Sequence, residues 1–181
     1  MILDIVQYGD PVLRERCGKV EEVDDELRKL VDDMIETMYD AQGVGLAAPQ
    51  IGKAIRLAVV DVSHDPECIS FLKVDGKDAD LASIMPLVFI NPELEFGKER
   101  EKDTEGCLSI SEIRADVRRP AVVKAKLPQL DGSVLEIETD GLLSRAIQHE
   151  TDHLNGVLFI DRVSPAAKVS VKRKLKRLVE G

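Results

Sequence analysis

Three segments of the chain place apolar residues at helical spacing with polar residues between them. They are residues 27–38, 142–154 and 166–178. The first has an acidic face opposite its apolar stripe, and the last sets its apolar positions among lysines and arginines. Thr139 or Asp140 can cap the start of the middle segment, and Gly156 can end it. The pattern predicts three helices, of which the middle one has the most apolar surroundings.

The remaining apolar runs are short or alternating, which is typical of strands. They are residues 55–62, 87–91, 121–127, 134–139 and the short pair Phe159–Ile160. Asp131 and Gly132 form a turn signal between two of these strands. Residues 63–85 are polar and are predicted to be a long mobile loop. Together these elements predict an α+β fold, with mostly antiparallel β-sheets packed around the central helix, an N-terminal helix and a C-terminal helix.

Composition predicts one domain over residues 1–181, with residues 163–181 as a basic helical tail. The 181 residues are 44% hydrophobic, which supports a sizeable core, and the low aromatic content of 3% with no Trp makes that core aliphatic. The first residues contain no basic leader and no long apolar stretch, so we expect a cytoplasmic protein with no membrane partner. The three cysteines are then expected to be thiols and not a disulfide framework.

Residues 149–153 read His-Glu-Thr-Asp-His and carry the strongest chemical signal in the chain. On a helix, the imidazoles of His149 and His153 point to the same side because they are four residues apart. Two neutral imidazoles at this spacing can hold a divalent ion, and Glu150 can take a proton from a water on that ion. The pattern indicates a metal-dependent hydrolase.

A third protein ligand must come from outside this motif. The metzincin pattern would place a histidine where this chain has Phe159, and the only glutamate beyond the motif is Glu180, next to the C-terminus. A thiolate from upstream is the best remaining donor. Of the three cysteines, Cys107 follows a glycine that frees the backbone to turn, whereas Cys17 and Cys68 lie in polar segments without such a context. One thiolate and two imidazoles leave the fourth position of a tetrahedral ion open for water.

Three separated segments resemble the three motifs of the peptide deformylase family. They are Gly43–Gln50 (Gly-Val-Gly-Leu-Ala-Ala-Pro-Gln), Glu105–Ser109 (Glu-Gly-Cys-Leu-Ser) and Gln148–His153 (Gln-His-Glu-Thr-Asp-His). Their order and spacing are also similar, and the likeness extends from Ile5–Leu13 to about Arg162. Any one motif alone would be a weak signal, but the three together are very specific.

The resemblance implies a metal centre and a reaction. Cys107, His149 and His153 would hold one Fe²⁺ per chain, with Zn²⁺, Ni²⁺ or Co²⁺ as substitutes, although the donor set by itself also suits zinc. Glu150 would be the general acid and base for attack of metal-bound water on the formyl carbonyl. The substrate would be the N-terminal formylmethionine of nascent polypeptides, from which the enzyme removes the formyl group.

The resemblance also assigns residues around the metal. The Gln50 amide and the Leu108 N–H would form an oxyanion hole, and the rest would bind substrate. Val44 and Gly45 would line the peptide groove, with the Gly45 backbone pairing to an extended peptide. Leu142 would face the pocket for the methionine side chain.

Two arginines near the predicted site, Arg145 and Arg114, are assigned roles outside the three motifs. Arg145 stands where the resemblance leads us to expect an apolar residue, one helical turn before His149. We expect its side chain to extend to solvent at the pocket rim and to shift the preference for the residue after methionine; pairing with an acidic residue or a substrate carbonyl is the alternative. Arg114 is expected to contact the peptide indirectly.

The basic tail predicts a partner for the protein, and two other functions compete with the deformylase assignment. Family members are thought to dock on the ribosome through a C-terminal helix, so we hypothesise ribosome binding by this tail, against the alternative of a plain solvated helix. DNA is not expected as a partner. The rival functions are a zinc peptidase, and a catalytically degenerate relative that only binds nascent chains; the intact Glu150 and Gln50 argue against the second.

Overall fold

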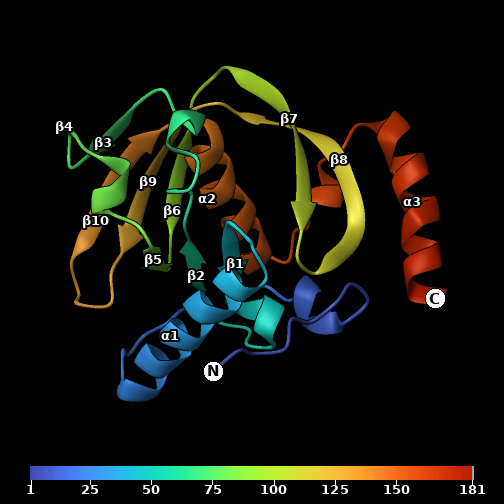
Figure 1. The fold of residues 1–181 in the computed structure, drawn as a ribbon, viewed down its shortest axis with the longest axis horizontal. Helices are drawn as coiled ribbons and strands as arrows, with labels where there is room; N and C mark the ends of the chain where they lie inside the picture. Colours follow the sequence, from blue (N-terminus) through green and yellow to red (C-terminus); the bar gives the residue numbers. More distant parts are fainter. Residues whose placement is uncertain (181) are drawn as a thin grey trace.

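The central helix of the fold is α2 (Gly141–Leu154), which lies between a five-stranded sheet and a long β-hairpin (Figure 1). The computed structural model describes residues 1–180. The other α-helices of this part are α1 (Asp25–Asp40) and α3 (Pro165–Glu180). The strands are β1 (Gly45–Ala47), β2 (Leu57–Val60), β3 (Leu72–Val74), β4 (Lys77–Asp78), β5 (Leu87–Ile90), β6 (Glu93–Phe96), β7 (Arg100–Cys107), β8 (Ile110–Pro120), β9 (Val123–Pro128) and β10 (Val134–Thr139).

These strands form three antiparallel sheets, so the predicted α+β class and sheet type are confirmed. The first sheet has the order β1-β2-β5, the second β4-β3-β10-β9-β6, and the third is the β7-β8 hairpin. In the hairpin, Glu105 pairs with Ala115 and Cys107 with Ile110, and the register shifts between these two pairs. A bulge at this place bends the strand, which re-aims the residues beside it. The bulge lies directly before the sulfur of Cys107.

Helix α1 forms as its amphipathic pattern predicts. The Asp24 carboxylate caps the helix by accepting a 2.8 Å hydrogen bond from the Leu27 N–H. Its apolar stripe, including the fully buried Met34 and Met38, packs in one cluster with residues of β1 and β2. The acidic residues lie mainly on the outer side, as expected for a solvated face.

Helix α2 begins and ends where predicted, but its start is held differently. Asp140 occupies the N-cap position, yet its carboxylate accepts a 2.7 Å hydrogen bond from the Ser70 N–H and does not cap the helix. The next residue, Gly141, has φ +57°, and a Cβ there would lie 1.9 Å from the Cys68 carbonyl oxygen. The helix therefore starts against the segment that precedes β3, and only glycine fits at that contact.

The core is aliphatic, as the composition predicted, and it surrounds α2. One cluster joins the inner residues of the five-stranded sheet to Leu143, Ala146 and Ile147 of α2. A second cluster lies under the hairpin and contains Val171 and Leu175 of α3, which thereby packs against β8. Most residues of α2 are buried, and the side of the helix that carries His149 and Glu150 faces a cavity.

Two predictions about secondary structure were wrong, and several strands were not predicted. Phe159 and Ile160 do not form a strand; they begin a 3₁₀-helix, Phe159–Asp161. Residues 63–85 are not an irregular loop, because they contain β3 and β4, and β3 pairs with β10 in the five-stranded sheet. The strands β6, β7 and β8 had no counterpart among the predicted elements. No helix in residues 1–180 is long and apolar enough to cross a membrane.

Candidate metal and catalytic site

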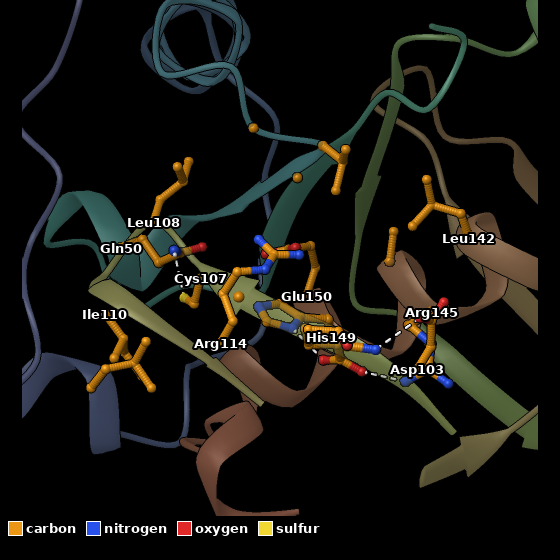
Figure 2. Close-up of a pocket in the computed structure, with 18 of the residues that line it drawn as sticks. Gln50, Asp103, Cys107, Leu108, Ile110, Arg114, Leu142, Arg145, His149 and Glu150 are labelled. Carbon is orange, nitrogen blue, oxygen red and sulfur yellow. Dashed lines mark hydrogen bonds and ion pairs between the residues drawn. The ribbon is translucent and has the colours of Figure 1, made fainter. Parts of the chain in front are cut away.

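Three potential metal ligands meet between the hairpin and the central helix. Cys107 ends β7, whereas His149 and His153 lie one turn apart on α2. Their ligand atoms all lie within 4.8 Å of one another, and Cys107 Sγ is 3.4 Å from His153 Nε2. Figure 2 shows two of the three residues, Cys107 and His149. The three residues that the sequence predicted as ligands are therefore brought together.

These residues fit a metal ion on chemical grounds. A tetrahedral ion with bonds of ~2.3 Å to sulfur and ~2.0 Å to nitrogen separates those two atoms by about 3.5 Å, close to the observed 3.4 Å. Burial lowers the pKa of His153 well below its ordinary value, which favours the neutral imidazole that a metal needs. Burial acts the same way on His149, but Glu150 and Cys107 outweigh it and raise its pKa, so metal binding there displaces a proton.

A buried carboxylate orients the first histidine. Glu105, 6% exposed on β7, has Oε1 at 2.9 Å from His149 Nδ1. This contact leaves Nε2 of His149 as the ring nitrogen available to a metal. The ring of Phe159 stacks beside the same imidazole at a centroid distance of 6.2 Å. Phe159, which cannot bind a metal, therefore packs against the predicted ligand His149.

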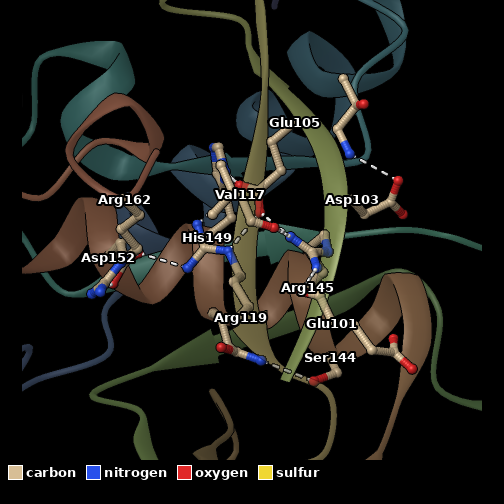
Figure 3. Close-up of polar contacts among 12 residues, drawn as sticks. Glu101, Asp103, Glu105, Val117, Arg119, Ser144, Arg145, His149, Asp152 and Arg162 are labelled. Atoms are coloured by element: carbon tan, nitrogen blue, oxygen red, sulfur yellow. Dashed lines mark hydrogen bonds and ion pairs between the residues drawn. The ribbon is translucent and has the colours of Figure 1, made fainter. Parts of the chain in front are cut away.

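Glu105 is the centre of an ion-pair network (Figure 3). Arg119 of β8 donates two hydrogen bonds to it, at 2.6 and 2.9 Å, and Arg145 of α2 donates a third at 2.6 Å. Burial alone raises the pKa of Glu105, but the hydrogen bonds and charges of His149 and Arg119 hold it well below its usual range. The carboxylate is therefore ionised at neutral pH.

Arg145 does not extend to solvent, so that prediction was wrong. Its side chain is buried, at 9% exposure, and its guanidinium also donates to the carbonyl oxygens of Val117 and Glu101, both at 2.9 Å. The alternative, pairing with an acidic residue, is confirmed by the contact with Glu105. A buried acid and two backbone carbonyls satisfy this cation, which explains why it is stable inside the protein.

Glu150 lies deep in the site, at 3% exposure, and its position depends on Gly45 of β1. A Cβ on Gly45 would lie 2.4 Å from Glu150 Oε2, so only glycine leaves space for the carboxylate. The other oxygen, Oε1, is buried and has no hydrogen-bond partner among the residues described. Burial raises the pKa of Glu150 to about 7, although the charge of His149 acts in the opposite direction. A carboxylate with such a pKa suits proton transfer near neutral pH.

The Gln50 amide is fixed beside the metal ligands. Its Oε1 accepts a 2.9 Å hydrogen bond from the Ala47 N–H, which orients the amide so that Nε2 faces Cys107. Nε2 lies 3.2 Å from Ser109 Oγ and 3.5 Å from Cys107 Sγ. Leu108, between these two residues, is held by the Gln7 amide, which donates a 3.1 Å hydrogen bond to its carbonyl.

A cavity of about 460 Å³ opens over these groups. Gln50, Leu108, His149 and Glu150 line it, together with all five residues predicted to bind substrate: Val44, Gly45, Arg114, Leu142 and Arg145. Figure 2 shows Leu142 and Arg145 at one end of this group and Leu108 and Gln50 at the other. Every predicted site residue thus belongs to the site or its wall, although Arg145 contributes as part of the ion-pair network.

The sequence analysis assigned no role to Glu105 or Arg119. Glu105 contacts the predicted ligand His149, and Arg119 holds Glu105. Asp152 belongs to the same network, because its carboxylate is buried and accepts hydrogen bonds from Arg119 at 2.8 Å and from Arg162 at 2.6 Å. The sequence carried a partial signal, since Glu105 stands two residues before Cys107 on the same strand. That signal could not be interpreted without the hairpin register and the docking of α2.

Comparison with known proteins gives a consistent result. The family described as polypeptide deformylase matches residues 2–169. A peptide deformylase from Methylacidiphilum infernorum is 45% identical over 181 residues, covering 100% of this chain and 95% of that protein. One from Chromohalobacter salexigens is 47% identical over 176 residues, covering 97% and 94%.

Solved structures with the same fold agree. The crystal structure of a peptide deformylase from Thermotoga maritima has a TM-score of 0.78 and 42% identity, and the match covers 91% of this chain and 99% of that one. A peptide deformylase from Synechococcus elongatus, solved in complex with actinonin, has a TM-score of 0.80 and 39% identity, with coverage of 97% and 85%.

Proposed function

The chain belongs to the polypeptide deformylase family, and we propose that it removes the formyl group from the N-terminal formylmethionine of nascent polypeptides, with Glu150 as general acid and base. The observation that carries this proposal is the position of Glu150. Its buried carboxylate lines the same cavity as Cys107 and His149, two members of the Cys107, His149 and His153 group, and has one oxygen without a partner in the described part of the chain. A structural carboxylate in the same place would need its oxygens satisfied.

We propose Fe²⁺ as the resident ion, one per chain, with Ni²⁺, Zn²⁺ or Co²⁺ as substitutes. Cys107, His149 and His153 would hold it through one thiolate and two imidazoles, donors that suit these ions. When bound, the ion supplies Lewis acidity that polarises the formyl carbonyl and lowers the pKa of a coordinated water. Metal analysis of protein purified without oxygen tests the assignment, because a thiolate beside iron is sensitive to oxidation.

The protein's own groups then move one proton and stabilise one charge. Glu150 accepts a proton from the attacking water and returns it to the amine nitrogen, so that the free amino terminus leaves as a neutral group. The Gln50 Nε2–H and the Leu108 N–H would donate to the oxygen that gains charge as the carbonyl carbon becomes tetrahedral. Loss of one such donor costs about 2.7–4 kcal/mol in other enzymes.

The cavity wall supplies the binding surface in this proposal. The Gly45 backbone lies on β1 and would pair with an extended peptide, since β1 has β2 as its only neighbour among the described strands. Val44 would line the peptide groove, Leu142 would face the methionine side chain, and Arg114 would contact the peptide indirectly; all three residues line the cavity. These binding roles stand as predictions.

The test is release of formate from a formyl-Met tripeptide by anaerobically purified protein. We expect turnover by the wild-type chain and at least a hundredfold lower kcat for Glu150→Gln, with Glu136→Gln on the outer sheet surface as the matched control at wild-type rate. Cleavage of internal peptide bonds would favour the zinc peptidase instead. Absence of turnover from folded, metal-loaded protein would favour the relative that only binds nascent chains.

We also propose that α3 binds the ribosome and that the enzyme acts in the cytoplasm as a single catalytic domain, residues 1–181. The apolar positions Val171 and Leu175 pack on the hairpin, so the basic residues of α3 face outward and are exposed: Lys168, Lys172, Arg173, Lys174, Lys176 and Arg177. Such a row of cations suits the phosphate backbone of RNA.

Cosedimentation with ribosomes over a range of salt concentrations tests this second proposal. A variant with four of the exposed bases changed to Gln keeps the packing residues and therefore the helix. We expect the wild-type chain to bind more weakly as salt rises and the variant to bind weakly throughout. Equal binding by the two proteins would leave α3 as a solvated helix.

A further inference from the structure

The metal ligands lie on two elements whose relative position is not set by backbone pairing. Cys107 belongs to the β7-β8 hairpin, which forms a sheet of its own, and His149 and His153 belong to α2. No described strand joins the hairpin to either of the other sheets. Side chains between the hairpin and α2 must therefore hold the sulfur and the imidazoles at one point.

Glu105 lies between the β7-β8 hairpin and α2, next to the metal ligands. It precedes Cys107 by two residues on β7, and both of its carboxylate oxygens are used. Oε1 contacts His149 Nδ1 and accepts from Arg119, and Oε2 accepts from Arg119 and Arg145, all at 2.6–2.9 Å. One buried group thus links both strands of the hairpin to two residues of α2 (Figure 3).

The two arginines that hold Glu105 are themselves fixed. Arg119 also donates to Asp152 at 2.8 Å, and Arg145 donates to carbonyl oxygens on both strands of the hairpin. Planar guanidinium groups with several partners have little freedom to rotate. The two guanidinium groups therefore fix the position of the Glu105 carboxylate, and the carboxylate in turn fixes the orientation of the His149 imidazole.

The two histidines are not equivalent in this respect. His149 Nδ1 has the carboxylate as a partner, whereas His153 Nδ1 is buried without a partner among the described residues. A carboxylate behind a metal-binding imidazole fixes its ring orientation and tautomer and makes it a better ligand. Only His149 has this support in the described structure.

We infer that Glu105 is a positioning residue, clamped by Arg119 and Arg145, that aims His149 Nε2 at the metal and sets the distance between α2 and Cys107. The inference rests on the proposed metal site. It assigns Arg145 to the architecture of the metal centre, with substrate selection at most a secondary role for this residue.

Binding of Co²⁺ tests the inference without using activity, because the visible spectrum of this ion reports its ligands and their geometry. We expect Glu105→Gln to lower Co²⁺ affinity by about 10–100-fold and to change the absorption bands, since the amide cannot keep both the imidazole and the two guanidiniums in place. Asp61→Asn is the matched control, because it also converts a buried, hydrogen-bonded carboxylate to an amide but lies outside the cavity. Its Co²⁺ affinity and spectrum should equal those of the wild type.

The outcomes separate this inference from the metal site on which it rests. Wild-type affinity and spectrum in Glu105→Gln, or equal losses in both variants, would overturn the role of Glu105 while leaving the site intact. Failure of the folded wild-type chain to bind Co²⁺ would overturn the metal site itself. If Glu105→Gln does not fold, Glu105→Asp replaces it, because this variant keeps the charge but withdraws the carboxylate, and an unchanged spectrum there would equally refute the inference.

Discussion

Replacement of Gly45 by alanine is the sharpest test of how the fold positions Glu150, the proposed general acid and base. The new methyl carbon would lie 2.4 Å from Glu150 Oε2, 2.8 Å from its Cδ and 3.0 Å from its Cγ. The backbone at Gly45 is not in the left-handed region, so alanine adds no backbone strain. The three nearest contacts of the new methyl carbon are therefore all with Glu150.

The size of the effect can be worked from these distances. Ordinary van der Waals contact begins at 3.4 Å, so the carboxylate has to retreat by about 1 Å. A misplacement of ~1 Å at a reacting group can cost about a hundredfold in rate. Stability should change far less, because the atom that meets the methyl group is the end of a flexible side chain, and an overpacking cost of about 1 kcal/mol is partly offset by the lower entropy of the unfolded chain.

The assay measures kcat for formyl-Met tripeptide together with unfolding in urea. Gly18→Ala is the matched control, since the nearest atom to a Cβ there is 3.9 Å away, and both of its values should equal those of the wild type. We expect Gly45→Ala to lose about a hundredfold in kcat while it retains most of its stability. A kcat within threefold of wild type would refute the reasoning, because it would mean that the position of Glu150 does not limit the reaction.

Three further predictions concern stability. Arg145→Met should destabilise the protein by about 3 kcal/mol in urea unfolding, because it removes one partner of the buried carboxylate of Glu105; a loss below about 1 kcal/mol would contradict the network. Leu143→Ala, at a fully buried position, should cost about 2–5 kcal/mol without changing metal content, and a change in both would show that the helix itself had moved. Burial raises the pKa of Asp161, but the hydrogen bond from Arg14 outweighs it and holds the pKa below 3.8. Stability from this pair is present at neutral pH and is lost as pH falls through the lowered pKa, so the deficit of Arg14→Leu in thermal unfolding should shrink below pH 3.8, and a constant deficit would oppose this account.

Local spacing was enough to predict the helices and the centre of the site. The imidazoles of His149 and His153 face the same side of α2 because residues four apart always do so on a helix. Helix α1 could be predicted for a similar reason, because its apolar stripe is visible in the order of its residues. These features depend on neighbours within one or two turns, which the sequence displays directly.

The hairpin shows where such patterns fail. Strand β7 has exposed residues on both faces over most of its length, so no alternation of apolar and polar positions marks it as a strand. Residues 72–74 likewise form a strand because they add to the edge of β10, and not because of their own pattern. In both segments the partner strand decides the structure.

The amino-acid sequence by itself was enough to predict the proposed metal ligands and the proposed base, because each residue type was chemically suited and its motif was local. Only the tertiary structure decided the role of Arg145, which the sequence placed at the solvent edge and the fold places inside a network. Glu105 lies 14 residues from Arg119 and 40 from Arg145 in the chain. Charges so far apart meet only once a hairpin has its register and a helix has docked on it, and neither of these can be deduced from the order of residues alone.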